Sequence, residues 1–245
     1  MVSESGRIRI AEIGPGTEPY IPRERFDELH YWEPATLERC YAVQKVLGAF
    51  AKSGHLGAKF YGEKNQEMGL PADVGDYSSI RRIDLGDGRE VHFHPDYFQD
   101  APEAGDDFAG GFHTVMLHNV TNLQQDWSGL KKMAQPEMEF LIRRAAGLVR
   151  PGGVLRVLNA FYTSKPVLGD ISPGNIVRLF KQSGLKLVRT SYSQEDFAYH
   201  YPGHPSYTDP GWAGILNTNR NLFSHGHAMP LPFILYFEKS SKRPK

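Results

Sequence analysis

The chain has 245 residues, of which 40% are hydrophobic and 23% are charged, a composition typical of a globular protein. Lysine plus arginine equals aspartate plus glutamate, at 28 each, so the basic excess of a broad nucleic-acid surface is missing and we expect no nucleic-acid partner. No stretch reaches the roughly 20 apolar residues of a membrane span, and the first residues hold no apolar run of signal-peptide length. We therefore expect a cytoplasmic protein without a membrane partner.

The first half of the chain predicts four strands and one helix. Residues 8–13 and 28–32 are short runs rich in apolar and aromatic residues, as in buried strands. Residues 35–52 carry apolar positions at helical spacing. Residues 90–94 alternate as in a strand, and residues 113–118 form another short apolar run.

The second half predicts two helices and three strands. A helix over 137–149 is ended by an Arg-Pro-Gly-Gly turn, and a strand over 154–159 follows. A helix over 173–183 precedes strands at 185–192 and 233–238. Because strands alternate with helices over most of the chain, we expect a mainly parallel sheet covered on both faces.

Two long stretches, at about 53–89 and 196–232, interrupt this alternation. Irregular segments of this length are usually functional or disordered, and their aromatic content argues against disorder. We expect one domain over 1–245, with these insertions forming a lid over its site. For the middle insertion two interpretations stay open: it closes over the site, or it packs as a surface excursion. The residues concerned are Tyr61, Lys64, Asn65 and Met68 for closure, and Phe60 and Leu70 for packing.

A glycine-containing turn follows the first strand. The segment AEIGPGTEP, residues 11–19, reads as a strand-to-helix turn whose glycines let the backbone approach a ligand closely. Glu33 ends the second predicted strand, where an acidic side chain can accept hydrogen bonds from the two hydroxyls of a ribose. The two features together favour an adenosine-type ligand over a plain tight turn and a solvated charge.

These features, taken in order, resemble a known family. The resemblance rests on E-x-G-x-G at 12–16, the acids Glu33 and Asp100, LVRPGGVLRV at 148–157 and SGLKLVRTSY at 183–192. In these features the chain resembles the class I S-adenosylmethionine-dependent methyltransferases. The resemblance implies a Rossmann-like, doubly wound α/β fold. Its mainly parallel, seven-stranded sheet would have a reversed last strand, with helices on both faces.

The resemblance also implies a cofactor, S-adenosylmethionine, and residues that bind it. Gly14 and Gly16 would lie against its methionine part and ribose, Glu12 would orient the loop or meet its amino group, and Glu33 would take the ribose hydroxyls. The third glycine of the family pattern is Glu18 here. That side chain either repels the methionine carboxylate or points to solvent.

The remaining implied positions follow the third and fourth predicted strands. Asp100, with Phe98 or Gln99, would meet the adenine, and His118 and Asn119 would border the transferable methyl group. A structural alternative for His118 is a strand-end histidine bonded to a backbone carbonyl.

The acceptor pocket would come from the irregular segments. The residues expected to act on the acceptor are His118, His200 and Tyr162, because histidine suits a general base near neutral pH and tyrosine can hydrogen-bond an acceptor. The late insertion also supplies aromatic residues that favour a flat ligand: Tyr199, Tyr201, Tyr207 and Trp212. Its histidines can instead bind loop carbonyls. His225 and His227, with His200 and Asp209, lack a known ligand spacing, so no metal is expected.

The sequence therefore predicts a methyltransferase acting on O or N of a small, aromatic-bearing acceptor, with a homodimer left open. The alternative is a regulatory or partner module of the same fold that binds the cofactor without transferring its methyl group. Another reaction with the same cofactor, such as aminopropyl transfer or cyclisation, also stays open, as does a protein acceptor.

Overall fold

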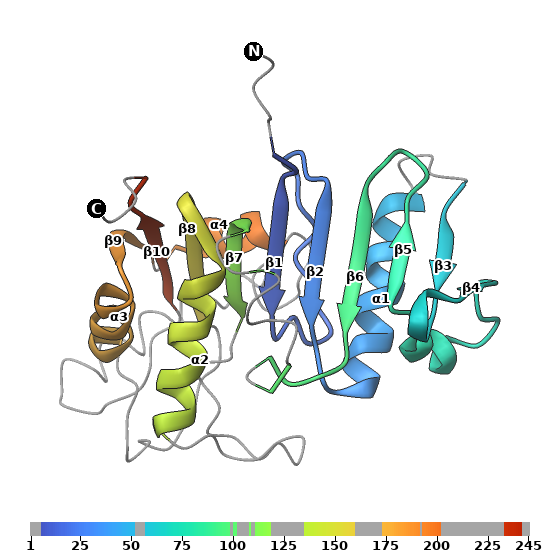
Figure 1. The fold of residues 1–245 in the computed structure, drawn as a ribbon, viewed down its shortest axis with the longest axis horizontal. Helices are drawn as coiled ribbons and strands as arrows, with labels where there is room; N and C mark the ends of the chain where they lie inside the picture. The colour runs from blue at the N-terminus through green and yellow to red at the C-terminus, as the bar shows by residue number, and fades with distance from the viewer. Residues whose placement is uncertain are drawn as a thin grey trace.

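The structure is a computed structural model, and it describes residues 6–51, 57–98, 100–101, 108, 111–118, 135–159, 173–191, 193–201 and 233–241. These residues form one ten-stranded sheet with helices on both faces (Figure 1). The strand order is β4-β3-β5-β6-β2-β1-β7-β8-β10-β9. The predicted α/β class is confirmed, whereas the predicted count of seven strands is wrong.

Five parallel strands form the middle of the sheet. They are β6 (Glu90–His94), β2 (Glu28–Trp32), β1 (Arg9–Ile13), β7 (Phe112–His118) and β8 (Val149–Asn159). All of β2 and nearly all of β1 and β7 are buried, as expected for parallel strands covered on both faces. The chain turns toward β2 after β1 and returns on the other side with β7, so the strand order reverses at β1.

The last described strand, β10 (Phe233–Lys239), runs antiparallel between β8 and β9 (Leu185–Ser191). The prediction of a reversed strand beside the strand at 185–192 is therefore confirmed. Residues of β8 and β10 pair from Phe233 with Asn159 to Glu238 with Val154.

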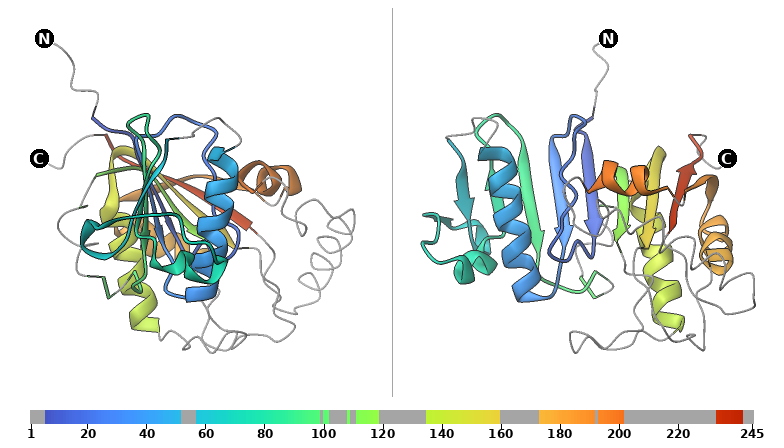
Figure 2. Two further views of the ribbon diagram at one scale, coloured as in Figure 1. Left: turned by 90° about the vertical axis from the view of Figure 1, so that its right-hand side faces the viewer. Right: turned by 180° about the vertical axis from the view of Figure 1, so that it is seen from behind.

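Helices α1 (Thr36–Ala51) and α4 (Gln194–His200) cover one face, and α2 (Gln135–Leu148) and α3 (Pro173–Gln182) cover the other (Figure 2). On the first face Val43 and Val46 of α1 and Phe197 of α4 pack in one apolar cluster with strand residues. On the second, Leu141 of α2 and Phe180 of α3 do the same. The helices predicted over 35–52, 137–149 and 173–183 are confirmed to within a few residues.

The middle insertion is not irregular. It contains β3 (Lys59–Tyr61), β4 (Glu67–Met68) and β5 (Arg82–Asp84), with short 3-10 helices at Glu63–Asn65 and Val74–Ser79. These strands pair antiparallel onto β6 and extend the sheet. Each strand has three residues or fewer, which is too short for an alternating pattern to stand out.

This extension lies away from the middle of the sheet, because β3, β5, β6 and β2 separate β4 from β1. Phe60 and Met68 pack against the apolar cluster that includes α1, while Leu70 is exposed. Phe60 therefore packs as the surface-excursion interpretation expects, whereas Leu70 does not. Met68, which the other interpretation assigned to closure over the site, packs in this extension as well.

Two further expectations need correction. No helix follows the glycine turn: residues 14–27 contain only turns and extended chain. Pro15, Pro19 and Pro22 lack a backbone N–H, and each restricts the residue before it, which disfavours a helix there.

The late insertion, predicted to be irregular, begins with α4. The Ser193 side chain caps this helix by accepting a hydrogen bond from Asp196 N. The rest of that insertion, 202–232, lies outside the described residues.

Among the helices that the structure describes, none has the length and apolar composition needed to cross a bilayer.

Candidate functional site

The turn after β1 is built by glycines with left-handed backbones. Gly14 has φ 73° and Gly16 has φ 58°, a region that side chains other than glycine rarely adopt. The Gly14 N–H donates to Trp32 O at 3.0 Å, and the Gly16 N–H donates to Glu33 Oε2 at 2.8 Å. A Cβ on Gly16 would meet no atom within 4 Å, so the turn borders open space.

Glu33 stands at the end of β2, as predicted, and is 7% exposed. Besides Gly16 N–H, its carboxylate accepts the Ala35 N–H at 3.0 Å through Oε1. Burial raises the pKa of Glu33 to about 7, because a carboxylate loses hydration when it leaves water. Each carboxylate oxygen has two lone pairs, so both can accept a further bond from a ligand hydroxyl.

A pocket of about 520 Å³ opens between the chain segments that follow β2 and β6, within the size range of small-molecule sites. Its lining residues come directly after those two strands: Pro34, Ala35, Pro95, Asp96, Tyr97 and Asp100. Asp100 therefore shares this pocket with Pro34 and Ala35, the two residues that follow Glu33, whereas Glu33 itself is not among the lining residues. Phe98 is instead buried, with its ring edge-on to Trp32 at 5.5 Å, and it is not among the lining residues.

Glu12 is fully buried and joins three distant parts of the chain. Its Oε2 accepts the Tyr20 N–H at 2.7 Å, and its Oε1 accepts the Tyr201 O–H at 2.6 Å. The Nδ1 atom of His118 lies 3.4 Å from the same Oε1. The His118 ring stacks on the Tyr201 ring, with centroids 4.3 Å apart. Glu12 thus bonds the chain that follows the glycine turn, at Tyr20, and faces the end of β7.

His200 lies on α4 and is 2% exposed. Its Nε2 is 3.2 Å from the Tyr236 hydroxyl, and its ring lies edge-on to Tyr20 at 5.9 Å. Burial, followed by the charge of Arg156, lowers the pKa of His200 to about 4. The imidazole is therefore neutral at neutral pH and engaged with a tyrosine of β10.

Several candidates fall on parts of the chain that the structure does not describe. These residues are Gln99, Asn119, Tyr162, His225, His227 and Asp209. Within the described ranges, no group of three or more histidine, cysteine, aspartate or glutamate residues is placed to hold a metal ion.

Glu18, which replaces the third glycine of the family pattern, forms an ion pair with Lys45 of α1. Its side chain is 24% exposed. The ammonium group offsets the carboxylate charge, so a negatively charged ligand at the turn would meet a neutralised pair rather than an isolated carboxylate.

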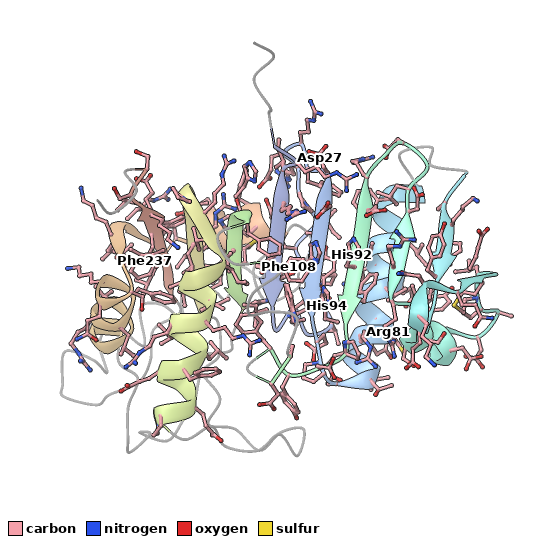
Figure 3. The ribbon with its side chains drawn as sticks, viewed as in Figure 1. Asp27, Arg81, His92, His94, Phe108 and Phe237 are labelled. Carbon is pink, nitrogen blue, oxygen red and sulfur yellow. The ribbon has the colours of Figure 1, made fainter. Side chains whose placement is uncertain are left out.

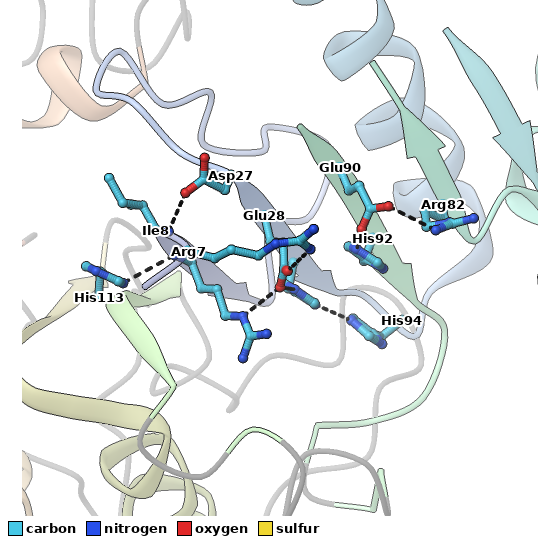
Figure 4. A network of polar contacts seen from close by, with 11 residues as sticks. Arg7, Ile8, Asp27, Glu28, Arg82, Glu90, His92, His94 and His113 are labelled. Carbon is cyan, nitrogen blue, oxygen red and sulfur yellow. Dashed lines mark hydrogen bonds and ion pairs between the residues drawn. The ribbon is translucent and has the colours of Figure 1, made fainter. Parts of the chain in front are cut away.

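Sequence reasoning missed a stack of aromatic rings that crosses β2 and β6, and we call His30, His92 and His94 the histidine ladder. Figure 3 labels its two members on β6, His92 and His94. His30 lies parallel to His92 at 4.4 Å, and His94 lies parallel to Trp32 at 4.2 Å. The ring nitrogens His30 Nδ1 and His94 Nε2 are 3.0 Å apart, and a dashed line marks this contact at His94 in Figure 4. Burial lowers the pKa of all three histidines, that of His92 to about 3. The sequence signals available were the i, i+2 spacing of His92 and His94 on one predicted strand and the presence of His30 on another.

The ladder ends at a charged network beside the amino ends of β1 and β2 (Figure 4). Glu28 accepts from Arg7 at 2.7 Å and pairs with Arg9 at 2.7 Å. The close approach of His30, whose Nε2 lies 3.5 Å from Glu28 Oε2, together with these arginines, holds the pKa of Glu28 well below its usual range. This network lies at the opposite end of the strands from Glu33, so it stabilises the sheet rather than the pocket.

No protein-family model matches the chain, and no curated protein matches its sequence. Solved structures do match it in fold. A geranyl diphosphate methyltransferase in complex with GPP and sinefungin aligns over 95% of this chain and 71% of its own, at 9% identity and a TM-score of 0.50.

Two other similar structures are a geranyl diphosphate C-methyltransferase from Streptomyces coelicolor A3(2), in complex with Mg²⁺, geranyl diphosphate and S-adenosyl-L-homocysteine, and the [4+2]-cyclase SpnF. The first aligns over 95% of this chain and 70% of its own, at 8% identity and a TM-score of 0.48. The second aligns over 97% and 77%, at 15% identity and a TM-score of 0.48. At such identities the likeness concerns architecture alone. The likeness to the first of these structures, at a TM-score of 0.50, together with the strand order β6-β2-β1-β7-β8-β10-β9, shows that the chain has the fold of the class I S-adenosylmethionine-dependent methyltransferases.

Proposed function

We propose that this protein is an S-adenosylmethionine-dependent methyltransferase that acts on an oxygen or nitrogen atom of a small molecule. The observation that carries the proposal is the joint placement of the glycine turn, the buried Glu33 carboxylate and the pocket beside it. All three lie at the carboxyl ends of β1, β2 and β6, where open α/β sheets bind their ligands.

The described residues fit this cofactor. Glu33 would accept the ribose hydroxyls, Asp100 and the other pocket residues would surround the adenine, and Gly16 would let the backbone approach the ribose and methionine part. Because no helix follows the turn, a helix N-terminus would not assist there. When bound, S-adenosylmethionine supplies a methyl group already activated by its sulfonium charge. The protein would mainly position the acceptor and exclude water.

The acceptor is proposed to be an aromatic-bearing small molecule. The support for this class is the gathering of aromatic side chains around Glu12, from both the early and the late parts of the chain. Tyr201 stacks on His118, and Tyr20 lies edge-on to both Tyr201 and His200. Aromatic side chains around a site favour flat, aromatic ligands, and these rings, which are buried against one another, would form the wall of such a site. His118, at the end of β7, is the proposed general base.

Calorimetric titration tests the cofactor. S-adenosylmethionine and S-adenosylhomocysteine should both bind, and NAD should not. Ala35→Trp, which places a large ring in the pocket lining, should abolish binding of S-adenosylhomocysteine. Leu37→Trp, two residues away and 63% exposed, is the matched control and should bind it normally. Absence of binding by the unmodified protein, or equal binding of NAD, would overturn the proposal.

The acceptor class is tested by incubating the protein with S-adenosylmethionine and panels of phenols, catechols and aromatic amines, while following S-adenosylhomocysteine release. Turnover with an aromatic hydroxyl or amine supports the assignment. A protein that binds the cofactor and turns over only aliphatic or macromolecular acceptors would contradict it.

A further inference from the structure

Glu12 is placed to act on His118 as well as on the turn after β1. We propose that Glu12 is a positioning residue that keeps the proton of His118 on Nδ1, with Tyr201 holding the Glu12 carboxylate in place, so that Nε2 carries the free lone pair. This inference rests on the proposed function, because the lone pair matters as the acceptor of a proton from a substrate hydroxyl or amine.

The burial of this cluster carries the first step of the argument. Glu12 is 0% exposed, Tyr201 is 3% exposed and His118 is 4% exposed. A buried carboxylate is costly unless donors surround it. Glu12 has two donors at hydrogen-bond distance, the Tyr20 N–H and the Tyr201 O–H. The third polar neighbour is His118 Nδ1, at 3.4 Å from Oε1.

The second step concerns the ring nitrogens of His118. Within the described residues neither Nδ1 nor Nε2 has a hydrogen-bond partner at standard geometry, although buried polar atoms are normally paired. The partner bonded to one ring nitrogen decides which nitrogen carries the proton. Because an ionised carboxylate only accepts, the nitrogen that faces Glu12 is favoured as the N–H donor. That nitrogen is Nδ1, so Nε2 is left as the base.

Tyr201 restrains both Glu12 and His118. Its hydroxyl fixes Oε1, and its ring stacks on the His118 ring at an interplanar angle of 25°. The carboxylate and the imidazole therefore have little freedom to turn away from each other. Hydrogen bonds of catalytic groups are often long before ligands bind and tighten in the complex, so a 3.4 Å separation is compatible with the role.

The chemical consequence is a defined path for one proton. Both ring nitrogens of His118 are buried in the described structure, so an acceptor would have to displace the side chains that cover Nε2. The hydrogen of its O–H or N–H would then pass to Nε2, and the carboxylate of Glu12 would stabilise the resulting imidazolium through Nδ1–H. His200 is unsuited to this task, because its Nε2 is engaged with Tyr236 and its pKa is lowered to about 4.

The experiment is nitrogen-15 NMR of the histidine side chains in the full chain at pH 7.5, with His118→Gln identifying the His118 signals. In the unmodified protein the His118 proton is expected on Nδ1. Glu12→Gln should give the averaged signals of an unconstrained ring, and Glu12→Asp should partly restore the Nδ1–H form. Tyr201→Phe keeps the stacking but loses the bond to Glu12, and should give an intermediate pattern.

Tyr20→Phe is the matched control. It removes a hydroxyl that donates to Glu24 but keeps the backbone N–H bond to Glu12, and should leave the His118 tautomer unchanged. A proton on Nε2 in the unmodified protein, or no change in Glu12→Gln, would overturn the inference. Titration with S-adenosylhomocysteine on the same samples separates the two proposals. Binding with the wrong tautomer refutes this inference alone, and the expected tautomer without binding refutes the proposed function alone.

Discussion

The raised pKa of Glu33 makes cofactor binding depend on pH in a specific way. Ribose hydroxyls donate to a carboxylate more strongly than to a carboxylic acid, and Glu33 has a pKa of about 7. Its ionised fraction is about tenfold larger at pH 8 than at pH 6. Affinity for S-adenosylhomocysteine should therefore rise about tenfold between these values, equivalent to about 1.4 kcal/mol.

Glu33→Gln should weaken binding at pH 8 roughly ten- to hundredfold, since hydrogen bonds to charged groups contribute about 1.5–3 kcal/mol. The same variant should lose the pH dependence. Glu63→Gln, whose side chain is 77% exposed at the far edge of the sheet, is the control and should keep the wild-type profile. Calorimetric titration at pH 6, 7 and 8 measures both effects. A flat profile in the unmodified protein, or an unchanged profile in Glu33→Gln, would refute the reasoning.

The same residue should affect stability in the opposite sense. The folded-state pKa of about 7 exceeds the ordinary value of 4.5, so between these pH values the folded state binds more protons than the unfolded state. Its contribution to the free energy of unfolding is present below pH 4.5 and is lost as pH rises through 7. It amounts at most to about 3 kcal/mol. Glu33 therefore costs stability at the pH at which it would best bind a ribose.

Three further outcomes are expected. Gly16→Val and Gly88→Val both impose a left-handed backbone on a β-branched residue. Each should lower the free energy of unfolding by about 1–2 kcal/mol. In calorimetry, only Gly16→Val should lose binding of S-adenosylhomocysteine. His92 has a pKa of about 3 in the folded protein against 6.5 ordinarily. Its contribution to the free energy of unfolding is therefore present above pH 6.5 and is lost as pH falls. In urea unfolding, the decrease in the free energy of unfolding between pH 7 and pH 5 should be about 2 kcal/mol smaller in His92→Gln. Phe112→Leu alters a ring that lies edge-on to His30 of the histidine ladder and removes no titratable group, so it should keep that pH dependence. An unchanged pH dependence in His92→Gln would contradict the assignment. Glu18→Gln should change the free energy of unfolding by less than about 1 kcal/mol, because it removes a partly exposed ion pair. It should also leave the cofactor affinity within about threefold of the wild-type value. A larger gain in affinity would show that the carboxylate repels the ligand.

The strands and helices of the central sheet could be predicted because each buries a recognisable pattern. The apolar runs of β1 and β7 indicate strands that are buried on both faces of the sheet, and the helical spacing of apolar residues in α1 indicates a helix that is buried on one face. The segment after Gly16 was predicted as a helix by analogy with other α/β folds, although its three prolines disfavour one. Tyr20, Phe197 and Tyr201 pack on that face in a common apolar cluster, a tertiary arrangement that local sequence does not encode.

The candidate site divides in the same way. Glu12, Gly14, Gly16 and Glu33 could be placed from the sequence, because each is fixed by the end of a strand. Tyr201 could not be linked to Glu12, since 189 residues separate them and only the fold brings them together. Phe98 was proposed to meet adenine from its position after β6, but its ring is buried against Trp32, because apolar packing outweighs proximity in sequence.

The position of β10 has a consequence for folding during synthesis. Among the described strands, β9 pairs with β10 alone, since the order at that end is β8-β10-β9. Until residues 233–239 have left the ribosome, β8 and β9 both have an unpaired edge, and β9 has no strand of the sheet beside it. Unpaired edges of this kind can pair with other chains. The nascent chain is therefore expected to need protection from aggregation until its last described strand is made.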